Sequence, residues 1–124
     1  MMRILFVDDD QRLLAGLRRS LRNLADEWAM TFADNAADAM RLLPISTFDV
    51  VVTDLAMPNV DGLSFLQFVI KHAPNAGRVV FSGENEAVHD LAAGQVAHVV
   101  LAKPAETSVL VDAVRTAYRA RSAN

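Results

Sequence analysis

The chain has no cysteine among its 124 residues, so disulfide bonds, thiolate catalysis and cysteine-ligated metal centres are excluded. Basic residues are also scarce, since 12 of them against 15 acidic ones leave a formal net charge of -3. Because binding through nucleic acid phosphates needs a basic surface, direct DNA binding is disfavoured. No apolar run approaches the roughly 20 residues of a membrane span, and the first run is too short for a signal peptide. We therefore expect a soluble, cytoplasmic protein with no membrane partner.

The composition that remains is that of one packed domain. A chain of 124 residues falls in the usual size range of a single domain. Its 52% apolar and 22% charged residues are close to the globular average, so a buried core is expected and wholesale disorder is not. We expect one domain over residues 1–121, followed by a short loose tail over residues 122–124.

Short apolar runs alternate with helical patterns five times along the chain. The runs expected to form strands cover residues 4–7, 30–33, 49–54, 78–81 and 96–102. Patterns with helical spacing follow them at about residues 11–24, 36–43, 63–72, 84–93 and 109–118. Because right-handed crossovers return the chain in the same direction, this order predicts a parallel sheet. The fold class expected is α/β, a doubly wound (βα)5 domain with five parallel strands and a flavodoxin-like architecture.

Polar residues stand where four of these strands end. They are Asp8, Asp9 and Asp10 after the first strand, Asp54 at the end of the third, Ser82 after the fourth and Lys103 after the fifth. Each has an ordinary explanation when taken alone, as a helix cap, a turn residue or a solvated loop residue. In a parallel sheet, however, the carboxyl ends of the strands meet at one edge. The coincidence favours one pocket that contains all of them.

The chemistry of such a pocket is that of phosphoryl transfer. Clustered carboxylates repel one another, and Mg²⁺, or Mn²⁺ in its place, prefers oxygen ligands and would relieve that repulsion. Lys103 adds an ammonium group and Ser82 a hydroxyl around Asp54. A phosphoryl group in transfer needs its equatorial oxygens neutralised and its attacking oxygen held in line. A carboxylate nucleophile forms an aspartyl phosphate, so the pattern favours Asp54 as the attacking group.

These residues resemble the receiver domain of two-component response regulators, from Arg3 to about Arg119. The resemblance is carried by Val7-Asp8-Asp9-Asp10, by the run from Asp49 to Gly62 that contains Asp54, and by Ser82 and Lys103-Pro104. It implies a CheY-like fold in which Asp54 is the phosphoacceptor. It implies that Asp9 and Asp54 bind Mg²⁺ directly, that Asp8 helps through water, and that the carbonyl of Ala56 is a backbone ligand. Ser82 and Lys103 would contact phosphoryl oxygens, and the Lys103-Pro104 bond would be cis.

The resemblance also implies partners and a switch. The phosphoryl donor would be a phosphohistidine on a sensor kinase or a phosphotransfer protein. Ser82 and the residue three before Lys103 would form the switch region, where Val100 stands in place of the usual aromatic residue. The run over residues 97–104 is similar to receivers joined to HD-type phosphodiesterase or related output domains. We therefore expect either a single-domain regulator or part of a longer one, and a monomer or a weak homodimer.

Three other functions are weighed against a phosphoacceptor module. A Mg²⁺-dependent phosphatase generally has an aspartate as general acid two residues after its nucleophile, where this chain has Ala56. A flavodoxin-like electron carrier needs donors for a flavin phosphate, which the aspartates after the first strand would repel. A pseudo-receiver that acts only as a scaffold is disfavoured by the intact acidic positions, Ser82 and Lys103. The function expected is signalling by phosphorylation of Asp54, without turnover of an external substrate.

Overall fold

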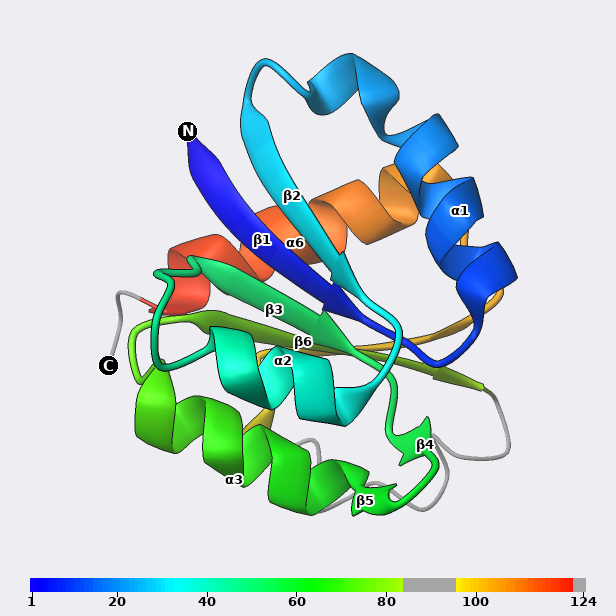
Figure 1. Ribbon diagram of the computed structural model, residues 1–124. Helices are drawn as coiled ribbons and strands as arrows, with labels where there is room; N and C mark the ends of the chain where they lie inside the picture. The colour runs from blue at the N-terminus through cyan, green and yellow to red at the C-terminus, as the bar shows by residue number, and fades with distance from the viewer. Residues whose placement is uncertain (84–95, 122–124) are drawn as a thin grey trace.

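A sheet of five parallel strands forms the centre of the molecule in the computed structural model, which describes residues 1–83 and 96–121 (Figure 1). The strands are β1 (Met2–Val7), β2 (Trp28–Ala33), β3 (Val50–Thr53), β6 (Gly77–Gly83) and β7 (Val99–Lys103), in the order β2-β1-β3-β6-β7. The described helices are α1 (Gln11–Ser20), α2 (Ala36–Leu42), α3 (Gly62–His72) and α6 (Thr107–Arg121), with a 3-10 turn η1 over Arg22–Leu24. The α/β fold predicted from the sequence is confirmed, while the helix expected over residues 84–93 lies outside the described residues.

The strand order sets the place where functional groups meet. After β1 the chain crosses to β2 on one side, and it then returns to form β3 on the other side of β1. Ligands of doubly wound folds bind outside the carboxyl ends of the strands at such a point of reversal. Figure 1 shows the arrowheads of β1 and β3 at one end of the sheet, with the small hairpin of β4 (Ala56–Met57) and β5 (Val60–Asp61) just beyond.

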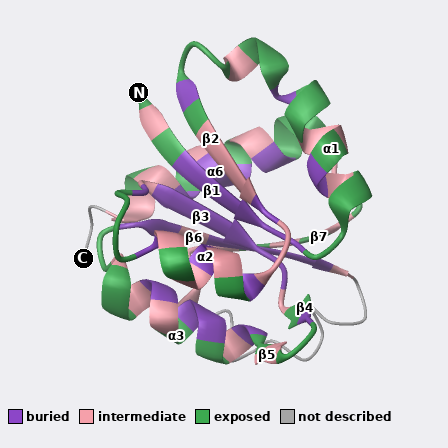
Figure 2. Cartoon of the chain, viewed as in Figure 1, coloured by how far each residue is buried: buried purple, intermediate pink, exposed green. Residues whose placement is uncertain are grey.

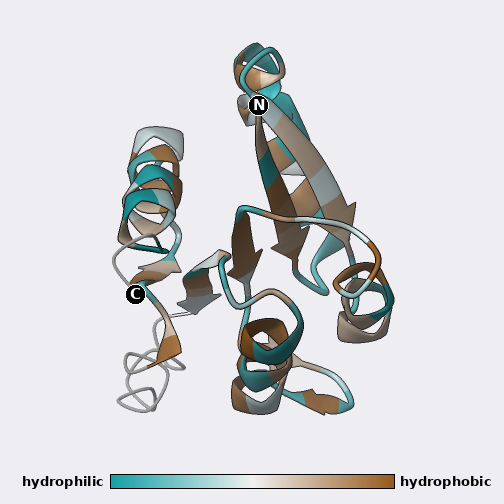
Figure 3. Ribbon diagram, turned by 90° about the vertical axis from the view of Figure 1, so that its left-hand side faces the viewer, coloured by the Kyte–Doolittle hydropathy of each residue, from teal (hydrophilic) through white to brown (hydrophobic). Residues whose placement is uncertain are grey.

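Both faces of the sheet are buried along its central strands β1, β3 and β6, which explains why these strands are mostly continuous apolar runs rather than alternating ones. Along β1, Ile4 and Phe6 join the cluster that includes residues of α1 and α6, while Leu5 and Val7 join the cluster with α2 and α3. Figure 2 shows the central strands as buried and the outer surfaces of the helices as exposed, and in Figure 3 the apolar colouring is concentrated on the strands and on parts of the helices. The two clusters place helices on both faces, as a doubly wound fold requires.

The first helix is shorter than its leucine spacing suggests. Asp10 caps it, since its carboxylate accepts hydrogen bonds from the backbone N–H groups of Arg12 (3.0 Å) and Leu13 (3.2 Å). The helix ends at Ser20, so the extension expected to residue 24 is wrong. The chain tightens instead into a 3-10 turn, in which the Leu24 N–H donates to the carbonyl of Leu21 at 2.9 Å. Leu21 and Leu24 still pack into the same apolar cluster as the leucines of α1. Their burial explains the regular spacing of the leucines, although the helix does not continue to residue 24.

Two further boundaries follow from tertiary contacts. Strand β2 begins at Trp28 rather than at residue 30, because it pairs with β1 from Met2 onward. After the third strand, a turn joins β4 and β5, and Asn59 in this turn adopts a φ of 68° in the left-handed region. Helix α3 begins at Gly62, close against Leu55 in the segment that follows the third strand. The turn and the helix start together fix the path of the chain just after Asp54.

Candidate functional site

Three carboxylates meet at the carboxyl ends of β1 and β3. Asp8 follows β1 and Asp54 follows β3, and the Asp54 N–H donates to the carbonyl of Val7 at 3.1 Å. Asp8 and Asp54 are buried, with 3% and 5% of their surface exposed, whereas Asp9 is exposed. One carboxylate oxygen from each of the three lies within 4.8 Å of the others. The convergence predicted from the strand ends is therefore confirmed for these three residues.

Lys103 and Ser82 complete the cluster from β7 and β6. The Lys103 ammonium donates to Asp8 Oδ2 at 2.6 Å and to Asp54 Oδ2 at 2.9 Å. The Ser82 hydroxyl, which is fully buried, donates to Asp54 Oδ1 at 3.0 Å. The peptide bond between Lys103 and Pro104 is cis, as expected. The Asp54 carboxylate is thus held from two neighbouring strands by a hydroxyl and by a cation.

Backbone groups fix the acidic side chains further. The Ala56 N–H donates to Asp54 Oδ1 at 3.1 Å, which brings Ala56 next to the buried carboxylate. The Asp10 N–H donates to Asp8 Oδ1 at 2.9 Å, while the Asp10 carboxylate caps α1. The third aspartate of the triplet therefore belongs to the helix start. The roles of Ala56 as a carbonyl ligand and of the other site residues toward a phosphoryl group stay predictions.

Burial and ion pairing act on these groups in opposite directions. Burial raises the pKa of Asp8 above its usual 3.8, although its hydrogen bonds from Lys103 and from the Asp10 N–H oppose the rise. Burial alone would lower the pKa of Lys103, but its hydrogen bonds to Asp8 and Asp54 outweigh burial and raise that pKa above 10.5. Lys103 therefore remains an ammonium ion at neutral pH. When the three carboxylates are ionised, one ammonium leaves the cluster with an excess of negative charge.

The donor set fits a hard divalent cation. The clustered ligand atoms of Asp8, Asp9 and Asp54 are carboxylate oxygens, which Mg²⁺ prefers, and the exposed Asp9 leaves room for the water ligands that this ion keeps. The net negative charge of the cluster attracts a cation electrostatically. The acidic cluster is typical of a receiver magnesium site.

Two residues at the site were not found by sequence reasoning. The Thr53 hydroxyl, fully buried at the end of β3, donates to the carbonyl oxygen of Asp54 at 2.8 Å. The ring of Phe81 lies beneath the Lys103 ammonium, with 5.6 Å between the nitrogen and the ring centroid. Both residues read as ordinary strand residues, since a β-branched and an aromatic side chain are each common there. Only their position next to Asp54 and Lys103 distinguishes them.

Other residues singled out by the sequence lie away from the acidic cluster. Val100 lies on the edge strand β7, where it pairs with Val80 and is 39% exposed. His98 accepts a hydrogen bond at Nδ1 from the Arg78 N–H (3.0 Å), and His72 packs on the ring of Phe68. The contacts of these two histidines are structural, and His89 lies outside the described residues.

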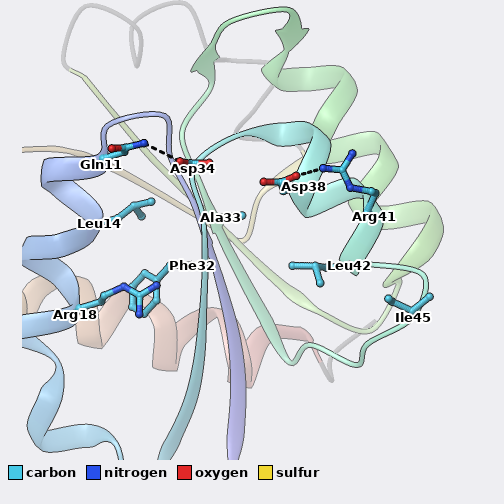
Figure 4. A pocket seen from close by; sticks show the side chains of 10 residues that line it. All are labelled: Gln11, Leu14, Arg18, Phe32, Ala33, Asp34, Asp38, Arg41, Leu42 and Ile45. Carbon is cyan, nitrogen blue, oxygen red and sulfur yellow. Dashed lines mark hydrogen bonds and ion pairs between the residues drawn. The ribbon is translucent and has the colours of Figure 1, made fainter.

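A groove of about 560 Å³ runs along the edge of the sheet at β2, between α1 and α2 (Figure 4). Arg18 of α1 stacks on Phe32 with its guanidinium carbon 4.3 Å from the ring centroid, and Gln11 donates to Asp34 at 2.9 Å. On the other side Arg41 pairs with Asp38. None of the clustered carboxylates, Ser82 or Lys103 lines this groove. The lining of the groove is therefore distinct from the acidic cluster.

The geometry and the comparisons agree on a family. Residues 4–115 match the family model described as the response regulator receiver domain. The chain belongs to the response regulator receiver domain family. Membership makes it a signalling module of two-component systems rather than a turnover enzyme, so neither the phosphatase nor the electron-carrier alternative holds. Among the described residues, no helix is long and apolar enough to cross a membrane.

Individual relatives are longer proteins or isolated receivers. The hydrogenase transcriptional regulatory protein HoxA of Bradyrhizobium diazoefficiens is 33% identical over 116 residues, which is 92% of this chain but 23% of that protein. A response regulator of Burkholderia pseudomallei, solved with a phosphorylated aspartic acid, calcium ion and citrate, has a TM-score of 0.78 at 26% identity and covers 99% of this chain and 72% of its own. The signal receiver domain of an HD domain-containing protein from Pseudomonas fluorescens Pf-5 has a TM-score of 0.84 at 25% identity, with 99% and 98% covered. The chain thus spans about a quarter of its first curated relative.

Proposed function

We propose that this receiver accepts a phosphoryl group on the carboxylate of Asp54. The observation that carries the proposal is the set of contacts around that carboxylate. It is 5% exposed, it accepts hydrogen bonds from Ser82 and Lys103, and it lies within reach of the oxygens of Asp8 and Asp9. A buried carboxylate that faces a cation, a hydroxyl donor and two more acidic groups matches the needs of a phosphoryl acceptor.

The reaction exchanges one bond to phosphorus for another. A carboxylate oxygen of Asp54 forms a P–O bond as the P–N bond of a phosphohistidine on the partner breaks, and the imidazole leaves with the electron pair of that bond. Lys103 and Ser82, which hold the carboxylate oxygens before transfer, then donate to phosphoryl oxygens. The signal ends by hydrolysis: water attacks the phosphorus, the P–O bond to Asp54 breaks, and the carboxylate of Asp54 and inorganic phosphate are formed. Asp54 is therefore regenerated unchanged.

Asp8, Asp9, Asp54 and the carbonyl of Ala56 would hold Mg²⁺, and Mn²⁺ is an alternative occupant. The ion supplies positive charge that lowers the cost of bringing two anions together. The chain's own contribution is to keep its oxygen donors in place, through the Asp10 N–H on Asp8 and the Ala56 N–H on Asp54. This proposal is supported by the donor chemistry and by the calcium ion in the Burkholderia pseudomallei relative.

The proposed phosphoryl donor is a sensor histidine kinase or a phosphotransfer protein, and the proposed location is the cytoplasm. The receiver domain is proposed to cover residues 1–121 and to be joined to an output domain. The output domain is supported by the greater length of HoxA, and the HD type by the Pseudomonas fluorescens receiver. The switch is proposed to act through Ser82 and Val100, on the neighbouring strands β6 and β7.

Intact-protein mass spectrometry tests the acceptor directly. The wild-type protein and Asp54→Asn are incubated with acetyl phosphate, with and without Mg²⁺, and treated afterwards with hydroxylamine. We expect a gain of one phosphoryl group that needs both Mg²⁺ and Asp54 and that hydroxylamine removes, as it does from an acyl phosphate.

Ser20 provides a matched control, since it is an exposed residue at the end of α1 away from the cluster. Ser20→Ala should gain the phosphoryl group at the wild-type rate. A gain that persists in Asp54→Asn, or that resists hydroxylamine, would assign the acceptor elsewhere. No gain in the wild-type protein, together with normal folding, would favour the pseudo-receiver scaffold.

A further inference from the structure

The hydroxyl of Thr53 is a buried polar group with no role in the chemistry described so far. Thr53 is the last residue of β3, whose four residues are all buried, and it is itself 0% exposed. Three valines precede it, and valine has nearly the same shape without the hydroxyl. A buried hydroxyl destabilises a protein unless it is hydrogen-bonded. The contact that this hydroxyl makes therefore points to its role.

That contact is with the backbone of the proposed phosphoacceptor. The Thr53 hydroxyl donates to the carbonyl oxygen of Asp54 at 2.8 Å. Asp54 lies just beyond the sheet, since the ladders with β1 and β6 both end at Thr53, paired with Val7 and Val80. The Asp54 N–H still reaches the carbonyl of Val7 at 3.1 Å. The sheet therefore anchors the amide side of Asp54, and the Thr53 hydroxyl anchors its carbonyl side.

Fixing that carbonyl fixes the peptide that leads onward from Asp54. The orientation of this peptide sets the direction of Leu55 and the place of Ala56, whose N–H donates to Asp54 Oδ1 at 3.1 Å. We infer that Thr53 is a positioning residue for phosphoryl transfer, because its hydroxyl holds the peptide after Asp54 and thereby aligns the acceptor carboxylate and Ala56. The inference rests on the proposed function of Asp54 as acceptor and of Ala56 as a ligand.

Two substitutions separate the hydroxyl from the rest of the side chain. Thr53→Val keeps the shape and removes the donor, whereas Thr53→Ser keeps the donor and removes a methyl group. Each protein is assayed for the rate of phosphorylation by acetyl phosphate at saturating Mg²⁺, for Mg²⁺ affinity by calorimetry, and for stability by urea unfolding. The NMR order parameters of the Leu55 and Ala56 amides are measured without metal.

We expect Thr53→Val to lower the phosphorylation rate about fivefold, the factor that corresponds to a net neutral hydrogen bond, and to weaken Mg²⁺ binding. Its Leu55 and Ala56 amides should also become more mobile. Thr53→Ser should keep the phosphorylation rate, the Mg²⁺ affinity and the amide order close to wild type, even where its lost methyl group lowers stability. A role confined to packing of the methyl group would give the opposite order, because serine, which lacks that methyl group, would then be the more damaging substitution.

Two results would overturn the inference. One is a Thr53→Val protein with wild-type phosphorylation, Mg²⁺ affinity and amide order. The other is a Thr53→Ser protein as impaired as Thr53→Val, which would assign the effect to methyl packing. Failure of the proposed function is a different result, namely a wild-type protein that gains no phosphoryl group. In that case the Mg²⁺ affinity and the order of the Leu55 and Ala56 amides still decide the role of the Thr53 hydroxyl.

Discussion

At Gly62, the start of α3 packs closely against Leu55 in the segment after the proposed acceptor, Asp54. A Cβ added to Gly62 would lie 2.6 Å from both the Cα and the carbonyl oxygen of Leu55. Ordinary contacts begin at 3.4 Å, so in Gly62→Ala the two segments must separate by about 0.8 Å. Both contacted atoms belong to the backbone and cannot rotate away. The displacement must therefore be taken up by the chain between Asp54 and Ala56 or by the start of α3.

We predict that Gly62→Ala loses both stability and phosphorylation. Overpacking of this kind costs about 1–3 kcal/mol, and the better helix propensity of alanine offsets less than about 1 kcal/mol of that. A misplacement approaching 1 Å next to reacting groups slows a reaction substantially, so we expect phosphorylation by acetyl phosphate to slow by about tenfold or more. Stability is measured by urea unfolding followed by circular dichroism, and phosphorylation by intact mass against time.

Gly77 offers a control with the same steric problem at the other end of the sheet. A Cβ there would lie 2.5 Å from the carbonyl oxygen of Ala117 on α6, and Gly77 begins β6, whereas Asp54 follows the end of β3. Gly77→Ala should lose a similar stability, about 1–3 kcal/mol, and keep the wild-type phosphorylation rate. Equal slowing in both variants would show that general destabilisation explains the effect. A wild-type rate in Gly62→Ala would refute the link from α3 to the acceptor.

Two other predictions concern charged groups. Lys103→Met should raise Mg²⁺ affinity about tenfold, because the Lys103 ammonium that competes with the ion for Asp8 and Asp54 has been removed. Calorimetry that shows equal or weaker Mg²⁺ binding in Lys103→Met would contradict this prediction. Burial and the nearby Arg78 lower the pKa of His98 below 6.5, so the folded state favours the neutral ring and the unfolding free energy should fall as pH drops below 6.5. Urea unfolding above and below pH 6.5 should show that the unfolding free energy falls less in His98→Gln than in the wild-type protein. The same fall in both proteins would disprove the contribution of His98.

Much of the fold could be predicted because burial on both faces of a parallel sheet leaves a simple signature. The runs at Ile4–Val7 and Val50–Val52 are apolar without alternation, and an aspartate follows the end of each strand, Asp8 after β1 and Asp54 after β3. Boundaries that depend on partners could not be predicted in the same way. Strand β2 starts at Trp28 because β1 is there to pair with it, and the leucine spacing of α1 continues through a turn that is not an α-helix.

The candidate site divides along the same line. Asp8, Asp54 and Lys103 could be found because polar residues stand at the ends of several strands, and those ends meet at one edge of a parallel sheet. Thr53 and Phe81 could not, since a threonine and a phenylalanine inside strands fit the pattern expected of strands. These two residues are distinguished only by their neighbours in the folded structure: Thr53 contacts the carbonyl of Asp54, and Phe81 contacts the ammonium of Lys103. Sequence patterns report burial and polarity, but they carry no information on which atoms meet.

Under the proposed function, the contacts that allow Asp54 to be buried are also those that prepare it to accept a phosphoryl group. Ser82 and Lys103 stand on neighbouring strands, where Ser82 pairs with Ala102 and Gly83 with Lys103, so the sheet itself keeps their spacing constant. In the protein without a phosphoryl group, these donors satisfy the carboxylate oxygens of Asp54. In the proposed reaction, the oxygens of the attached phosphoryl group lie beside these same donors, so the reaction requires no new donor. A site organised in this way depends on backbone placement, which is why substitutions at Thr53 and Gly62 should affect the chemistry without removing any of the reacting groups.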